Sequence, residues 1–371
     1  MLDAIGIVNF EARNAEIKGL SQFRTIPAMS FLGRYRVIDF VLSNMVNSGI
    51  DHIKVMINDK PRSLIEHIGS GTEYNINPKH GYLQLLYPDT MAVSDAYFHD
   101  VYLMRENLRD FEKDHHKYIV ISPSYMICCL DYQKVIEEHE KSGADITAVY
   151  ANVKNADEAF TGCQSLTLDA NGRVTDILPN LGNARKSAIL METYVLRREL
   201  FCSLLEQAPS ISPLFSFVDI LRSVVRGFDI RGYEYKGYLS CINSLEAYYE
   251  ANMELIDHKR AEKLFKDGWP IYTKTNDSPP ANYRKHASVK KCIVANGCEI
   301  DGELENCILG RGVVVEKGAR IKNSLILPNT FVCEGADLNY VILDKHARVV
   351  EKKKLIGKED KLIYIKRSDR V

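Results

Sequence analysis

The sequence lacks an apolar segment long enough to cross a lipid bilayer. Its most apolar stretch, residues 118–130, is interrupted by Pro123, and it is shorter than the roughly 20 residues that a membrane-spanning helix needs. The first residues show no basic segment followed by an apolar one, as a secretory leader would. We therefore expect a soluble, cytoplasmic protein without a membrane partner.

Charge of one sign is also missing. The chain has 48 Lys and Arg residues against 49 Asp and Glu residues, a formal net charge of −1, and no long block of either sign. Proteins that bind nucleic acids gather basic residues to neutralise the phosphates. The balanced composition therefore predicts no nucleic-acid partner.

Paired cysteines are absent too. The nine cysteines include no CxxC motif and no cysteine and histidine group at metal-ligand spacing, and Cys128 directly precedes Cys129. His115 and His116 show no ligand spacing either. The pattern favours buried thiols in a reducing cytoplasm over a disulfide framework, and it predicts no bound metal.

What the sequence does contain is a repeat of seventeen residues between Glu303 and Lys353, in which aliphatic residues follow at intervals of five, six and six. The residues in step are Leu304, Ile321 and Leu338, then Leu309, Ile326 and Leu343, then Val315, Val332 and Val349. An α-helix cannot keep this spacing, whereas a coil of three short parallel strands can. We therefore predict a left-handed parallel β-helix of hexapeptide repeats. Corners at Gly318 and Gly335 and upstream residues Val289, Val294 and Ile300 give about four coils.

At 371 residues the chain is too long for one ordinary core. Residues 1–260 alternate strand-like and helix-like segments, which predicts an α/β, Rossmann-like domain with a mostly parallel sheet. The segments are Ala4–Val8, a helix around Val37 to Met45 that ends before Gly49, Ile53–Ile57, Tyr118–Ile121, Tyr132–Ser142 and Asp145–Tyr150. A linker over residues 261–285 and a β-helix domain over residues 286–371 are expected to follow.

Such sheets bind ligands beyond the carboxyl ends of their strands, here after Val8 and after Ile121. Residues 9–14 contain no closely spaced glycines that would let the backbone approach a phosphate. Residues 122–130 contain no carboxylate for a divalent cation. Both places where a nucleotide-binding protein of this class would hold phosphate and metal are therefore unusual.

Residues 24–50, RTIPAMSFLGRYRVIDFVLSNMVNSGI, resemble the N-terminal signature of the ADP-glucose pyrophosphorylase family, also called glucose-1-phosphate adenylyltransferase. The segments DANGRV (169–174), YYEANMEL (248–255) and WPIYT (269–273) and the C-terminal repeat extend the resemblance over almost the whole chain. The family joins ATP to glucose 1-phosphate, with magnesium held by two aspartates.

The chain departs from that family at the positions that carry the chemistry. The resemblance places Tyr125 and Cys241 where the family has its metal-binding aspartates, and Ile26 where it has a lysine that neutralises phosphate charge. Glu16 stands for an arginine, and residues 177–181 (ILPNL) stand for the glutamate, lysine and proline that bind the sugar phosphate. We expect no catalytic residue and no metal site to be retained, with Asp95 as a remnant of the nucleotide pocket.

These departures predict a regulatory, catalytically impaired subunit of glycogen biosynthesis. Its partner would be the catalytic subunit, in a hetero-tetramer, although a homo-oligomer stays open. Arg24 and Arg36 match family positions near the site for anionic sugar-phosphate effectors. A weakly active nucleotidyltransferase that uses Asp131 or Asp219 is the alternative. Acyl transfer by the β-helix, with His286 or His346, is disfavoured because no acceptor pocket is evident.

Overall fold

The computed structural model describes residues 2–10, 17, 19–57, 60–87, 99–211, 216–351 and 354–371, without the side chain of Ile211. The chain forms two compact units. The first comprises Met1–Ala15, Ile38–Cys241 and Lys266–Tyr272, and the second comprises Glu16–Val37, Ile242–Phe265 and Thr273–Val371. Each unit is assembled from separate stretches of the chain. The division into residues 1–260, 261–285 and 286–371 stays a prediction.

The first unit is built on a sheet of nine strands among the described residues. Its parallel part is β1 (Ala4–Asn9), β4 (His52–Met56), β5 (Tyr82–Leu86) and β6 (Tyr118–Pro123), with β1 between β4 and β6. The remaining strands are β8 (Ile146–Val153), β9 (Gln164–Leu168), β10 (Val174–Pro179), β11 (Ser187–Arg197) and β12 (Ile230–Glu234). The predicted strands are confirmed and the sheet is mostly parallel.

Five strands of this sheet, β5, β9, β10, β11 and β12, were not anticipated, and β11 changes the strand order most. The long β11 runs antiparallel to both β6 and β8 and separates them, whereas β8 and β12 are parallel. The strand-like segment Asp145–Tyr150 is therefore a strand, β8, but not the parallel neighbour of β6 that a simple doubly wound order would give. Glu192 and Thr193 interrupt the apolar residues of β11 at a bulge, where its register with β8 shifts, so the sequence shows no single apolar run for this strand.

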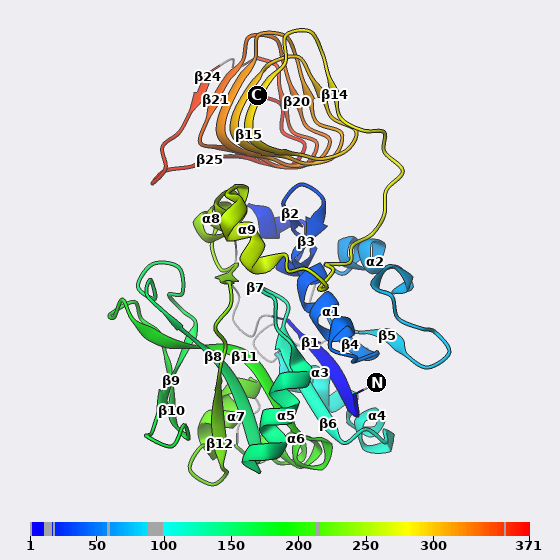
Figure 1. Cartoon of the computed structure of the whole chain (residues 1–371), viewed down its shortest axis with the longest axis vertical. Coiled ribbons are helices and arrows are strands. Elements are labelled where there is room, and N and C mark those ends of the chain that lie inside the picture. Colours follow the sequence, from blue (N-terminus) through cyan, green and yellow to red (C-terminus); the bar gives the residue numbers. More distant parts are fainter. Residues whose placement is uncertain are drawn as a thin grey trace. The chain divides into compact units, whose positions relative to one another are not determined.

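Helices of the first unit pack against this sheet and against one another (Figure 1). They are α1 (Val37–Asn47), α2 (Arg62–Ile68), η3 (Thr72–Tyr74), α3 (Asp100–Glu106), α4 (Leu108–Lys113), α5 (Tyr132–Ser142), α6 (Arg198–Ile211) and α7 (Phe217–Val224). The predicted helices α1 and α5 are confirmed. α5 begins where the Asp131 side chain accepts the Gln133 N–H at 3.1 Å, and it ends at Gly143, whose φ of 65° suits glycine.

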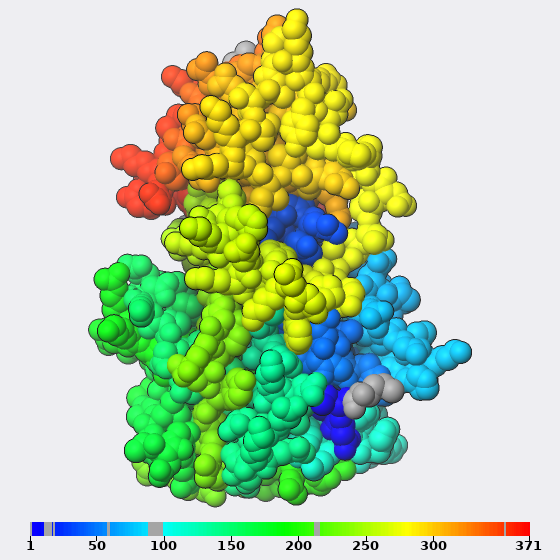
Figure 2. Space-filling model, in the orientation of Figure 1, coloured from blue at the N-terminus to red at the C-terminus, as the bar shows by residue number. Residues whose placement is uncertain are grey.

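The second unit contains the predicted left-handed β-helix, which is confirmed. Its strands pair only in parallel and in register among the described residues, so Leu304, Ile321 and Leu338 stack and are at most 2% exposed. The strands are β14 (Asn282–Tyr283), β15 (Ser288–Val294), β16 (Glu299–Ile300), β17 (Glu303–Leu309), β18 (Val314–Val315), β19 (Arg320–Ile326), β20 (Phe331–Val332), β21 (Asp337–Asn339), β22 (Val341–Leu343), β23 (Arg348–Val349), β24 (Lys354–Ile356) and β25 (Ile363–Ile365). Figure 1 shows them as stacked coils coloured yellow to red, and Figure 2 shows the same segment in space-filling form.

Shorter elements complete the second unit. They are η1 (Leu20–Gln22), η2 (Ile26–Ala28), β2 (Ser30–Phe31), β3 (Tyr35–Arg36), α8 (Leu245–Met253), η5 (Glu254–Ile256) and α9 (His258–Leu264). α8 packs on β17 and β19, where the Tyr249 hydroxyl donates to the Asn323 carbonyl at 2.6 Å. The neighbouring Tyr248 hydroxyl donates to the Ser30 carbonyl. No helix among the described residues has the length and apolar character needed to cross a membrane.

Candidate functional site

The carboxyl ends of β1 and β6 lie side by side, with Asn9 opposite Pro123. Asn9 Nδ2 donates to Asp100 Oδ2 at 2.7 Å, and the same carboxyl group accepts the N–H groups of Val101 and Phe217 at 2.8 and 3.1 Å. Asp100 is 1% exposed, and burial raises the pKa of its carboxyl although all three donors lower it. Sequence analysis missed this residue. The Asp100 carboxyl group lies at the carboxyl ends of β1 and β6. Its hydrogen bonds hold the beginnings of α3 and α7 there.

The structure brings Tyr125 and Cys241 together. A two-stranded ribbon of β7 (Met126–Cys128) and β13 (Leu239–Cys241) pairs Cys241 with Met126, the residue that follows Tyr125. Both side chains are buried, and Cys241 Sγ lies 3.5 Å from Cys163 Sγ. Two positions that are 116 residues apart in the sequence therefore share one end of a ribbon.

These groups do not fit a magnesium ion. Magnesium requires oxygen ligands in octahedral geometry, usually carboxylates, and here a phenol and a thiol occupy the ribbon end. The adjoining thiols are protonated at neutral pH, because burial raises the pKa of Cys128 to about 12 and that of Cys129 above its ordinary value. These side chains therefore support no magnesium-dependent reaction step at the ribbon end.

Asp131 and Asp219, which a weakly active nucleotidyltransferase would use, have other partners. Asp131 caps α5 and lies 3.3 Å from Lys134 Nζ. Asp219 accepts from the Ser216 hydroxyl and from Arg222 at 2.7 and 2.8 Å, and it accepts the Ser216 backbone N–H at 3.2 Å as part of the capping box of α7. Both carboxylates serve helix ends, so neither replaces a lost metal ligand without breaking a cap.

The other predicted positions carry no charge or lie outside the described residues. Ile26 is 5% exposed on η2 of the second unit, beside buried Pro27 and Ala28. In the segment over residues 177–181, Ile177 is buried while Leu178 and Leu181 are 47% and 71% exposed. Asp95 and Glu16 lie outside the described residues.

Arg24 forms a buried ion pair with Asp344, both within the second unit. Arg24 is 1% exposed and Asp344 is fully buried. Asp344 also accepts the Tyr364 hydroxyl at 2.8 Å and the Lys345 N–H at 2.6 Å. The second guanidinium nitrogen, Nη1 of Arg24, is buried and has no hydrogen-bond partner among the described residues. A buried donor of this kind favours an additional acceptor.

More basic than acidic side chains lie around the Arg24–Asp344 ion pair. The pKa of Lys345 is lowered to about 7 by its burial and by the charges of Arg36 and Arg24, which outweigh the attraction of Asp344. Burial and the charges of Arg367 and Lys345 also lower the pKa of His346. The candidate effector residues Arg24 and Arg36 thus belong to one cationic cluster with Lys345, His346 and Arg367. The polar run Asp344–Lys345–His346, which lies between the repeat residues Leu343 and Val349, was the available sequence signal for Lys345 and His346 in this cluster.

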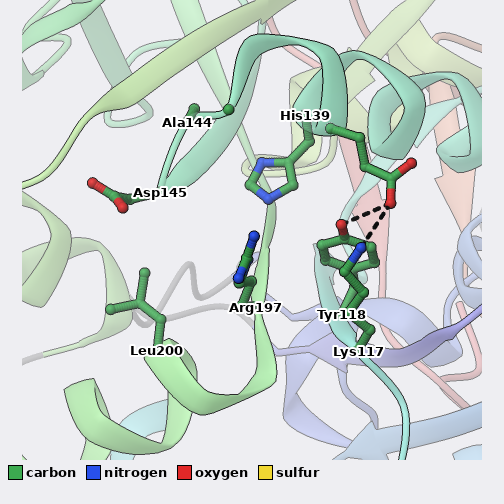
Figure 3. A pocket seen from close by; sticks show the side chains of 9 residues that line it. Lys117, Tyr118, His139, Ala144, Asp145, Arg197 and Leu200 are labelled. Atoms are coloured by element: carbon green, nitrogen blue, oxygen red, sulfur yellow. Dashed lines mark hydrogen bonds and ion pairs between the residues drawn. The ribbon is translucent and has the colours of Figure 1, made fainter.

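A cavity of about 460 Å³ opens at the amino end of β6, opposite to Asn9 and Pro123 (Figure 3). Glu140 accepts from Lys117 Nζ at 3.1 Å and from the Tyr118 hydroxyl at 2.7 Å. Burial, and then the charge of Arg197, lower the pKa of His139. Within the cavity lining, Lys117 and Glu140 form an ion pair, and the cavity does not include a residue that sequence analysis selected.

The comparisons with known proteins cover the whole chain. A family model described as "Nucleotidyl transferase" matches residues 16–258, and one described as "GlmU-like, C-terminal hexapeptide" matches residues 279–362. The glycogen biosynthesis protein GlgD of Bacillus subtilis is 31% identical over 98% of this chain and 95% of that protein. GlgD of Geobacillus stearothermophilus is 31% identical over 85% and 82%, respectively. The glucose-1-phosphate adenylyltransferase of Clostridium perfringens strain SM101 is 30% identical over 82% and 79%.

Proposed function

Because this chain belongs to the nucleotidyl transferase family and is related to ADP-glucose pyrophosphorylases and to proteins of glycogen biosynthesis, we propose that it is a regulatory, catalytically impaired subunit of glucose-1-phosphate adenylyltransferase. It assembles with the catalytic subunit and changes how fast that subunit makes ADP-glucose from ATP and glucose 1-phosphate.

The observation that carries the proposal is the shared ribbon end of Tyr125 and Cys241. The resemblance places the two metal-binding aspartates of the family at these positions, and their adjacency in the structure supports that assignment. Adenylyl transfer depends on cations that neutralise the charge on the transferring phosphate. Replacing both metal ligands by uncharged groups, with Ile26 at the lysine position, removes this stabilisation.

The parts that assembly needs are intact. The β-helix coils stack without interruption, and α8 is anchored on them through Tyr249. A chain that had only drifted would lose core residues as readily as site residues, whereas the stacked residues of the β-helix are still aliphatic and buried. The retained body therefore favours a role in association.

The cationic cluster around Arg24 suits an anionic effector such as a sugar phosphate. Burial and the charges of Arg36 and Arg24 lower the pKa of Lys345, and the buried Nη1 of Arg24 has no acceptor among the described residues. A phosphate group placed there would relieve the repulsion and accept this hydrogen bond. We propose that this chain senses the effector and transmits binding to its catalytic partner.

Co-expression with the catalytic homologue tests the proposal. We expect a mixed tetramer by size-exclusion chromatography with light scattering, and an activity or effector response that differs from the catalytic chain alone by about fivefold or more, as for allosteric coupling. The matched control is a mixture in which the catalytic chain has lost its own metal-binding aspartates, which should be inactive. Two separate species with unchanged kinetics would contradict the proposal.

The alternative, a weakly active nucleotidyltransferase, is tested in the same series. The isolated chain is assayed with ATP, glucose 1-phosphate and magnesium, and we expect no ADP-glucose above background. Turnover that disappears in Asp131→Asn or Asp219→Asn would favour the alternative, because these carboxylates would then act in place of the lost ligands.

A further inference from the structure

Three side chains that can ligate a metal ion lie together on the loop between α4 and β6. One carboxylate oxygen of Asp114 and one ring nitrogen each of His115 and His116 all lie within 4.8 Å of one another. Within the described part of the chain, this is the one group of three or more such residues. It lies at the amino end of β6, away from the ribbon end of Tyr125 and Cys241.

Hydrogen bonds and ring stacking fix the loop. Asp114 Oδ1 accepts the backbone N–H of His116 at 2.9 Å and lies 2.5 Å from His116 Nδ1. The Arg198 side chain donates to the His116 carbonyl at 3.0 Å. The rings of His115 and His116 stack, with centroids 4.4 Å apart and planes at 29°. Because the backbone and the rings are already ordered, a bound ion would cost little additional conformational entropy.

The charges around the loop suit a cation. The Asp114 side chain contributes the one carboxylate of the group, and it is 13% exposed. The nearby cation Lys54 is engaged with Gln84 Oε1 at 2.9 Å and with Asp110 at 3.8 Å.

A third imidazole, that of His52, adjoins the group. The ring of His52, the first residue of β4, has its centroid 4.4 Å from that of His116. His52 Nδ1 lies 3.0 Å from Asp51 Oδ1. A carboxylate paired with one ring nitrogen orients the imidazole and leaves the other nitrogen for a metal, as in the outer shell of many metal sites. His52 thus places one more imidazole beside the three proposed ligands.

Imidazole and carboxylate ligands select the metal class. Such a set suits Zn²⁺, Ni²⁺, Co²⁺ or Cu²⁺ and disfavours Mg²⁺ and Ca²⁺, which prefer oxygen ligands. Two ligands on a tetrahedral Zn²⁺ are about 3.4 Å apart for bond lengths near 2.1 Å. The three ligand atoms lie within 4.8 Å of one another, so they reach this spacing by closing over at most about 1.4 Å, which a rotamer adjustment can supply.

We propose that Asp114, His115 and His116 form a binding site for a divalent transition-metal ion. The ion would be chelated by three side chains of the loop between α4 and β6, close to β4. The positions that the resemblance assigns to adenylyl transfer lie elsewhere.

Calorimetry with Zn²⁺ on the untagged, chelator-treated full-length chain tests this proposal. We expect one ion per chain, a higher melting temperature in its presence, and at least about tenfold weaker binding in His115→Ala. His115 is exposed, so its removal takes away the ring stack on His116 but no buried packing. The matched control is His258→Ala, which removes an 86% exposed histidine 3.4 Å from the Glu262 carboxylate and should bind as the parent chain does.

The proposal would be overturned if the parent chain bound no ion or if His115→Ala bound the ion as tightly as the parent chain does. It would also be overturned if His258→Ala weakened binding as much as His115→Ala does. Substituting Co²⁺ for Zn²⁺ guards against a site made by cysteines. Thiolate ligands give strong charge-transfer absorption, whereas imidazole and carboxylate ligands do not, so a thiolate spectrum would assign the ion elsewhere.

Discussion

At the scale of single residues, the strongest electrostatic feature is the crowding of cations near Asp344. A lysine with a pKa near 7 lies beside Arg24 and Arg36 and holds its proton only weakly. Crowding of this kind destabilises a protein in isolation. It is retained where an anionic ligand compensates for it, which agrees with the proposed effector role of the cluster.

The pKa of Lys345 predicts a pH dependence of stability. Its ordinary value is 10.5 and its folded value is about 7, so between these pH values the unfolded chain binds more protons and the free energy of unfolding rises with pH. The destabilisation is complete below pH 7 and fades toward pH 10.5. We expect Lys345→Met to gain less stability than the parent chain between pH 7 and 9, as measured by urea unfolding. Equal gains in the two proteins would contradict the assigned pKa.

The same charge predicts the pH response of effector binding. An anion raises the pKa of Lys345, so binding above pH 7 takes up a proton and affinity falls as the pH rises. Lys345→Met should bind the anion more weakly at pH 7 and lose this proton uptake, which calorimetry in two buffers of different ionisation enthalpy measures.

At the scale of elements, α5 shows that a carboxylate after a strand of this sheet can serve to cap a helix. Asp131 receives the Gln133 N–H and Gly143 occupies a left-handed conformation, so the two residues define the beginning and the end of the helix. The nearest carboxylate after β6 is thus explained by capping. The alternative function that relied on Asp131 loses its main candidate.

Substitutions at these two ends should be destabilising. We expect Asp131→Ala to lower the free energy of unfolding by about 1 kcal/mol through loss of the cap, and Gly143→Ala by about 1–2 kcal/mol because φ is 65°. Glu137→Ala, at an exposed position inside the helix, should stay within about 0.5 kcal/mol. Denaturant unfolding followed by circular dichroism measures all three. A large effect of Glu137→Ala alone would contradict the capping explanation.

At the scale of the whole molecule, the β-helix is a stack in which each coil is buried by its neighbours. Ile321 lies between Leu304 and Leu338 in register and is fully buried. Because every coil supports the next, a cavity in the middle of the stack should affect the stability of the unit and the assembly that depends on it.

We expect Ile321→Ala to lower the free energy of unfolding by about 2–5 kcal/mol, the usual range for a buried isoleucine. Lys322→Ala, one residue further along the same strand, is the matched control, since Lys322 is exposed and pairs only with exposed Glu305 among the described residues. Its effect on stability should be negligible, and mixed-tetramer formation should be reduced only in Ile321→Ala. Equal effects of the two variants would argue against stacking as the source of stability.

How far the sequence predicts this protein depends on the range of the interactions involved. The coils of the β-helix, the ends of α5 and the strands β1, β4 and β6 were predictable, because each follows from a period or a cap within a few residues. β11 was not predictable as the antiparallel divider between β6 and β8, since strand order depends on pairings between distant residues.

The candidate site divides in the same way. The sequence by itself determined that Tyr125, Cys241 and Ile26 cannot supply the charges that the resemblance leads us to expect at their positions, because the identity of a side chain decides whether it can hold charge. Only the tertiary structure decided that Tyr125 and Cys241 share a ribbon end and that Lys345 joins Arg24 and Arg36. Distance, burial and the resulting shifts in pKa arise when the folded chain removes water and brings remote residues together, and no local pattern encodes them.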